Sequence, residues 1–410
     1  MNERLALLDG VRIVGFTQWL FGPAAAQYLG DMGAEVIKVE PPVRGSWERA
    51  WAGGNTFLNE VSACFLLTHR NVRSIALDLR EPTSQDAARR LISSADIVIE
   101  NYRPGVMEKF GLDYHRVREI KPDIIYASAS GYGRSDGPYR RLPGQDLLIQ
   151  ALTGLIWAGG QDHQVPRPAG AAVVDQHAAL LLAAGILGAL LHRERTGKGQ
   201  EVEVTMVEAA LDLQLEPVVY YMNGGTVEQP ATPIGSAFHQ APYGVYPTRD
   251  GYVVLSLSPI TSVSAALGAP PGLAELSDRD SMMGRRDEIY RIISPLVADR
   301  ERDELVAELR GHGVWCAPVL DYAEMLTDPG VQHLSPVQEV DDPRAGRVRL
   351  LRHPIRYSSG EPRIHRPPPA VGEHSREILA ELGYSPEEID DITSSSRPRP
   401  QAGPGDDAER

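Results

Sequence analysis

Residues 11–40 read VRIVGFTQWLFGPAAAQYLGDMGAEVIKVE, and this stretch decides the fold. The apolar run at 11–14 predicts a strand. A helix follows from Gly22-Pro23, because proline suits the first turn of a helix. Residues 34–40 are a second apolar run and predict the next strand. Strand, helix and strand in this order form a βαβ unit, in which the two strands are parallel.

The same alternation continues along the first half of the chain. Further strands are predicted at 74–79, 95–100 and 124–129, with a helix-forming stretch at 114–119 between the last two. Strands separated by helices indicate an α/β fold with a doubly wound, mostly parallel sheet.

Composition limits the class of protein. The chain has 410 residues, 42% hydrophobic and 23% charged, which is ordinary for a soluble globular protein and long enough for two domains. A net charge of −14 argues against nucleic-acid binding. Cys64 and Cys316 are far apart and lack metal-ligand spacing, so we expect reduced thiols, no metal and a cytoplasmic protein. The N-terminus does not resemble a signal peptide.

A carboxylate precedes the most apolar part of the chain. Asp175 comes just before residues 178–191, 14 consecutive residues without a polar side chain. This run is shorter than a membrane span and predicts a buried core helix, so we expect no membrane association. Locally, Asp175 is best explained as an N-cap, and the helix dipole would keep it ionised.

The known nucleotide-binding and catalytic motifs are absent. The turn after the first strand lacks G-x-G-x-x-G, which leaves an NAD-dependent dehydrogenase as a distant alternative. Three cations follow predicted strands or lie in the loops beyond them: Arg80, Arg103 and Lys109. Loops at the carboxyl ends of parallel strands gather at one edge, so these cations could meet a polyanion there. Taken singly, each is better explained as a solvated surface charge.

Several runs in register give the sequence a family resemblance. They are Leu8–Ile13, Gly22-Pro23, Gly33–Glu40, Arg73–Leu79, Ala95–Gly105, Gly131–Gly133, and Asp175 together with Arg195–Gln200. Together they resemble the class III CoA-transferase family, which includes formyl-CoA and carnitine CoA-transferases and the related α-methylacyl-CoA racemases. The resemblance runs from about Leu8 to Ile392.

The resemblance implies an architecture. It implies a large α/β domain built from both chain ends, a smaller middle domain, and a homodimer of two interlocked rings. We therefore assign residues 1–223 and 318–392 to the large domain and the turn-rich region 224–317 to the small one. Residues 393–410 are Ser, Pro, Gly and charge, and we predict a disordered tail.

The resemblance also implies site residues. Asp175 falls where these transferases keep a nucleophilic aspartate. The positions that match CoA-lining segments are Leu20, Phe21, Leu77, Asp78, Leu79, Arg80, Asn101, Tyr102, Arg103, Lys109, Pro143, Gly144, Gln145 and Asp146. Gln145 stands where the racemases have an acid/base histidine, and an amide cannot transfer protons near neutral pH. His177 is better explained as a first-turn helix residue than as a catalytic group.

The function expected from the resemblance is transfer of CoA from an acyl-CoA to a carboxylic acid. Asp175 would form an aspartyl mixed anhydride and then an aspartyl-CoA thioester, with helix N–H groups stabilising the oxyanions. CoA would be a substrate, and no permanently bound cofactor is expected. Two alternatives remain: an α-methylacyl-CoA racemase or epimerase, and a non-catalytic acyl-CoA-binding protein.

Overall fold

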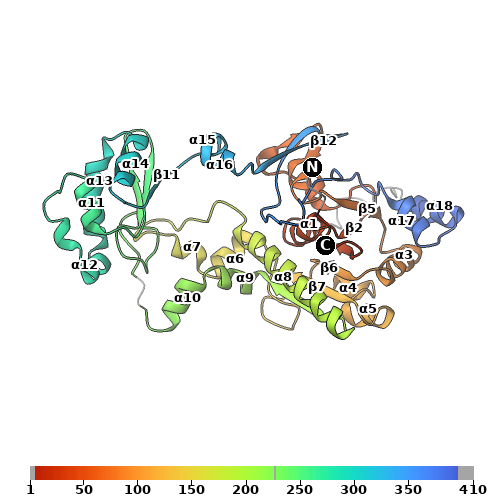
Figure 1. Cartoon of the computed structure of the whole chain (residues 1–410). Coiled ribbons are helices and arrows are strands. Elements are labelled where there is room, and N and C mark those ends of the chain that lie inside the picture. The colour runs from red at the N-terminus through yellow and green to blue at the C-terminus, as the bar shows by residue number, and fades with distance from the viewer. Residues whose placement is uncertain (1–4, 226–227, 396–410) are drawn as a thin grey trace, which may run out of the picture. The chain divides into compact units, whose positions relative to one another are not determined.

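The computed structural model describes residues 5–225 and 228–395 (Figure 1). The chain divides into two compact units. Unit 1 comprises Met1–Asp146, Val173–Ala209 and Ser335–Arg410, and unit 2 comprises Leu147–Ala172 and Ala210–Leu334. Each unit is described by itself.

Unit 1 contains a six-stranded sheet in which every neighbouring pair is parallel. Its order is β5 (Val72–Ala76), β2 (Glu35–Glu40), β1 (Arg12–Phe16), β6 (Ile97–Glu100), β7 (Ile125–Ser130) and β8 (Glu201–Thr205). From β1 the chain builds the sheet outwards on one side through β2 and β5, and later on the other through β6, β7 and β8. The carboxyl ends of β1 and β6 therefore form the switch point where open α/β sheets bind ligands.

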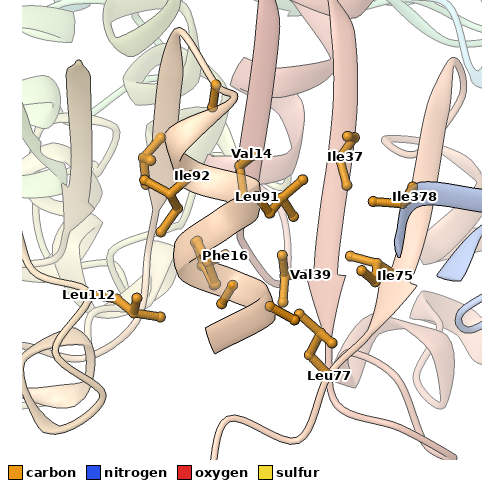
Figure 2. Packing of buried hydrophobic residues seen from close by; sticks show 14 of the residues in the cluster. Val14, Phe16, Ile37, Val39, Ile75, Leu77, Leu91, Ile92, Leu112 and Ile378 are labelled. Carbon is orange, nitrogen blue, oxygen red and sulfur yellow. The ribbon is translucent and has the colours of Figure 1, made fainter. Parts of the chain in front are cut away.

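Alternating strand residues give the sheet two apolar faces. Val14, Phe16, Ile37 and Val39 point to one face and join a buried cluster (Figure 2). The helices on this face are α3 (Pro82–Ser93), α5 (Tyr114–Ile120), α17 (Ser375–Glu381) and α18 (Pro386–Ser395). The helices α1 (Phe21–Asp31) and α8 (Val173–Thr196) pack against each other and against strands of the sheet. The α/β fold with a parallel, doubly wound sheet is confirmed.

The remaining elements of unit 1 surround this sheet. They are η1 (Trp47–Arg49), η2 (Gly53–Asn55), β3 (Phe57–Leu58), β4 (Val61–Ser62), α2 (Ala63–Leu66), α4 (Val106–Lys109), and the antiparallel pair β12 (Val337–Asp342) and β13 (Gly346–Leu351). The helices α6 (Asp146–Leu152) and α9 (Met206–Leu213) begin in unit 1 and end in unit 2.

Unit 2 is built on an antiparallel sheet of β9 (Gly244–Pro247), β10 (Tyr252–Leu255) and β11 (Cys316–Pro318). Its core also includes residues of α11 (Ile260–Ala266), η3 (Ala274–Leu276), α12 (Arg279–Gly284), α13 (Arg286–Ala298) and α14 (Arg302–Gly311). The other helices are α7 (Leu155–Ala158), α10 (Leu215–Met222), α15 (Tyr322–Thr327) and α16 (Pro329–His333).

Several predicted boundaries differ from the structure. The strand predicted at 74–79 is β5, which ends at Ala76, so residues 77–79 follow the strand instead of belonging to it. The predicted tail begins too early, because α18 continues to Ser395. Its remaining residues, 396–410, lie outside the described ones. The compact units also change at other points than 223/224 and 317/318, since residues 147–172, 210–223 and 318–334 belong to unit 2. The predicted domains stay a prediction.

The helix α8 is less enclosed than predicted. It has 24 residues, and among the described residues it is the one helix that could cross a membrane by length and composition, with 44% of its most apolar window buried. Leu180, Ala184, Gly188 and Leu191 are exposed along one side. The expectation of a helix buried all round is therefore wrong for the single chain, because only one side of α8 packs within unit 1.

Candidate active site

The loops that follow β1 and β6 are joined at the switch point. The Asn101 side chain accepts a hydrogen bond from the Gln18 N–H and donates one to the Gln18 carbonyl, each at 2.8 Å. Gly22, in the first turn of α1, lies so close that a Cβ there would be 2.9 Å from the Thr17 side chain and 3.1 Å from that of Asn101. A side chain at position 22 would therefore force the two loops apart.

The three predicted cations have different surroundings. Arg80 is exposed, but its guanidinium binds Asp78 through two hydrogen bonds of 2.8 and 2.7 Å. Arg103 and Lys109 are also exposed, in the loop after β6 and at the end of α4. Arg103 and Lys109 are therefore the more accessible candidates for contact with phosphate.

Sequence reasoning missed Arg134. Its guanidinium donates to Glu100 at 3.0 Å, to Ser128 at 2.7 Å and to Glu108 at 3.1 Å. Glu100 in turn accepts the Tyr102 N–H at 3.1 Å. Burial raises the pKa of Glu100 to about 7, and the positive charge of Arg134 opposes this rise. Arg134 thus ties the loop after β7 to the predicted CoA-binding segment after β6.

The first turn of α8 is capped from another part of the chain. Asp146 Oδ2 accepts the N–H groups of Val174 at 2.8 Å and Asp175 at 3.0 Å. The N-cap role expected for Asp175 is therefore wrong, because Asp175 lies inside the first turn and Asp146 satisfies its free N–H groups. The same two N–H groups are already engaged, so they cannot serve as the expected oxyanion donors while Asp146 keeps this position.

Two glycines bring Asp146 to this place. A Cβ on Gly144 would lie 2.6 Å from the Cα of Gly131, and the reverse distance is also 2.6 Å. Only glycine allows the two backbone segments to approach this closely. The chain between the two glycines therefore forms a loop whose ends touch. Asp146 begins α6 two residues after this contact.

Asp175 has an unusual acidity. Burial, followed by the negative charge of Asp146, raises the pKa of Asp175 from 3.8 to about 7. Burial and a like charge therefore outweigh the helix dipole, and the expectation that the dipole keeps Asp175 ionised holds only in part, because a pKa of about 7 leaves it partly protonated at neutral pH. A carboxylate poised near neutral pH at a helix start is typical of a functional site.

The other predicted CoA-lining residues fall into groups. Phe21, Leu77 and Leu79 are buried. Leu20 and Tyr102 are half-buried. Pro143, Gly144 and Gln145 are exposed, and Asp146 is buried.

Known proteins match the chain over most of its length. The profile of CoA-transferase family III matches residues 8–375. This chain belongs to CoA-transferase family III. Succinyl-CoA:glutarate CoA-transferase of Mus musculus is 32% identical over 92% of this chain and 86% of its own length. Succinate–glutarate CoA-transferase of Agrobacterium fabrum is 31% identical, with 93% and 97% covered. The crystal structure of a CAIB/BAIF family protein from Brucella suis has a TM-score of 0.78 at 30% identity, covering 93% of this chain and all of that one.

The protein is thus a class III CoA-transferase, and the resemblance drawn from the sequence is confirmed. CoA-transferases act on CoA thioesters and carboxylic acids, and these are its substrate classes.

Proposed function

We propose that this CoA-transferase works through Asp175 as a covalent nucleophile. The observation that carries the proposal is the Asp175 carboxyl in the first turn of α8, freed from capping by Asp146. A carboxylate can attack a thioester only when it is ionised, and a pKa of about 7 leaves a large ionised fraction at neutral pH.

The proposed reaction has four steps. The Asp175 carboxylate attacks the acyl-CoA carbonyl, which forms a mixed anhydride and expels CoA thiolate. The thiolate attacks the aspartyl carbonyl, which releases the donor acid and leaves an aspartyl-CoA thioester. The acceptor carboxylate attacks that thioester, which regenerates a mixed anhydride and thiolate. The thiolate then attacks the acceptor's acyl carbonyl, which gives the new acyl-CoA and free Asp175.

The charges around Asp175 favour formation of these covalent intermediates. Its negative charge disappears when the anhydride or thioester forms, so the repulsion by Asp146 is relieved in the covalent intermediates. Burial and a like charge disfavour the ionised carboxylate, and the uncharged anhydride and thioester avoid both penalties. The surroundings that raise the pKa therefore also favour acylation.

Succinyl-CoA and glutarate are the first substrates to test, because two relatives are named as succinyl-CoA:glutarate and succinate–glutarate CoA-transferases. The protein is incubated with succinyl-CoA, trapped with hydroxylamine, and analysed by intact-mass spectrometry and peptide mapping. We expect an adduct on Asp175 that is absent in Asp175→Ala. His177→Ala, altered in the same helical turn, should keep the adduct. Exchange of the substrate α-proton with solvent deuterium and no adduct would favour racemisation instead.

We also propose a homodimer. Leu180, Ala184, Gly188 and Leu191 recur at helical spacing, so they form one apolar side of α8 that the chain itself leaves exposed. Burying this side against a second copy would explain a helix apolar all round. Light scattering coupled to gel filtration should give twice the mass of 44.8 kDa, and a monomer mass would reject the dimer. Cytoplasmic localisation stays a prediction.

A further inference from the structure

The loop between β1 and α1 holds a bulky residue in a strained conformation. Trp19 has a φ of 64°, in the left-handed backbone region that residues other than Gly, Asn and Asp rarely adopt. Its indole is exposed, and it lies against the Trp51 ring edge-on, with centroids 5.7 Å apart at 71°. Such strain persists only where surrounding contacts fix the backbone.

Buried side chains supply these contacts, residue by residue. The Thr17 carbonyl accepts a hydrogen bond of 2.5 Å from Lys38 Nζ. The Trp19 N–H donates to Glu48 Oε2 at 2.9 Å. Between them, both backbone groups of Gln18 bind Asn101, so three consecutive residues of the loop are fixed by side chains from three other parts of the chain.

Lys38 and Glu48 form an ion pair with almost no exposure. Lys38 Nζ lies 3.1 Å from Glu48 Oε1, and their side chains are 2% and 0% exposed. Although burial opposes ionisation, Lys38 and the His69 ring, whose Nε2 lies 3.3 Å from Glu48 Oε1, hold the pKa of Glu48 far below its usual range. Two apolar side chains would fill this space at lower desolvation cost, so stability alone does not account for the pair.

The ion pair also fixes the backbone of the loop between β1 and α1. Besides pairing with each other, Lys38 donates a hydrogen bond to the Thr17 carbonyl, and Glu48 accepts one from the Trp19 N–H. Glu48 lies in η1, three residues before Trp51. The ion pair thereby fixes the two tryptophans relative to each other and also the chain that enters α1.

We propose that Lys38 and Glu48 are positioning residues for acyl-CoA binding. They hold the loop 17–20 in its strained form, and this loop leads into Leu20 and Phe21 at the carboxyl edge of the sheet. The inference rests on the proposed function, in which this edge binds the CoA thioester. Neither residue touches the reacting atoms, so the pair acts on acyl-CoA affinity and leaves the chemical steps nearly unchanged.

The test replaces the pair by apolar residues of similar volume, Lys38→Met with Glu48→Leu. A matched control removes another buried pair of unit 1, Arg70 and Asp31, which are joined at 2.6 Å, as Arg70→Met with Asp31→Leu. A third protein, Lys38→Met with Glu48→Gln, loses the charges but keeps an acceptor for the Trp19 N–H. Each is measured for KM and kcat with succinyl-CoA, and for the circular-dichroism couplet of the two indoles, defined by its loss in Trp19→Phe.

We expect the apolar pair to lose the couplet and raise KM about tenfold, with kcat changed less than about threefold. The glutamine variant should recover much of both signals, and the control should keep both. A folded apolar variant with unchanged couplet or unchanged KM would overturn the proposal, as would an equal rise of KM in the control.

Two further measurements keep the test decisive. If the apolar variant does not fold, Trp19→Gly replaces it, because glycine has many accessible conformations besides this one and lacks the indole that lies against Trp51, so the loop is no longer held. Its KM should rise about tenfold without loss of stability, and an unchanged KM would overturn the proposal. If the wild type transfers no CoA, calorimetric binding of CoA replaces KM. The positioning role can then be tested even if the proposed function fails, because CoA affinity is measured without turnover.

Discussion

Replacing Asp146 by asparagine is expected to make Asp175 more acidic. Asparagine keeps an oxygen that can accept the Val174 and Asp175 N–H groups, so the cap of α8 survives while the negative charge is lost. The pKa of Asp175 is raised from 3.8 to about 7, first by burial and second by Asp146. Burial is the larger cause, so Asp146 accounts for less than half of the rise. We therefore expect the pKa to fall by about 1 unit, to about 6.

The assay is the pH dependence of kcat/KM with succinyl-CoA, which reports ionisations of the free enzyme. In the wild type, kcat/KM should rise with pH through about 7, because only ionised Asp175 attacks. In Asp146→Asn the rise should come about 1 unit lower, so that the ionised fraction at pH 6 increases from about a tenth to about a half. Asp136→Asn, a fully exposed aspartate of the same loop, is the control. A limb that stays in place or moves to higher pH would refute the reasoning.

Three more predictions follow from the same contacts. Gly144→Ala should destabilise the protein by about 1–3 kcal/mol in urea unfolding, because its Cβ would lie 2.6 Å from the facing glycine, and it should also lower kcat by displacing the cap. Arg134→Met should lower the free energy of unfolding by about 3 kcal/mol, since it leaves Glu100 buried without its cation. Asp175→Asn should unfold at a higher temperature than the wild type at pH 8. A raised folded pKa means that the folded state binds more protons than the unfolded one between pH 4 and 7, so wild-type stability falls as pH rises through this window and the advantage of the variant vanishes near pH 4.

Each of these three variants has a matched control. Gly137→Ala places a Cβ 3.9 Å from its nearest neighbour and should be tolerated. Arg116→Met removes an exposed pair with Glu119 and should change stability by less than about 1 kcal/mol. For Asp175→Asn, the wild type at pH 4 is the internal control. Equal losses in the first two controls, or a pH-independent gain in the third case, would contradict the assignments.

The sequence was most informative where the signal is local. The apolar runs of β1, β2, β6 and β7 stand in the chain as continuous strand-length segments, so their order already implied a parallel sheet. Asp175 could be singled out because it precedes an apolar run long enough to be a helix. The boundary errors at β5 and α18 are also local, since strand and helix ends depend on hydrogen-bond partners that periodicity does not reveal.

The site depended on contacts between distant residues. Asp146 caps α8 from 28 residues away, Arg134 reaches Glu100 across 34 residues, and Lys38 pairs with Glu48 across 10 residues. None of these pairs has a spacing that a helix or a strand would impose. The sequence by itself therefore determined the order of strands, the family and the position of the nucleophile candidate. Only the tertiary structure decided which charges meet and how acidic Asp175 is, because desolvation and pairing arise only when the chain has closed around them.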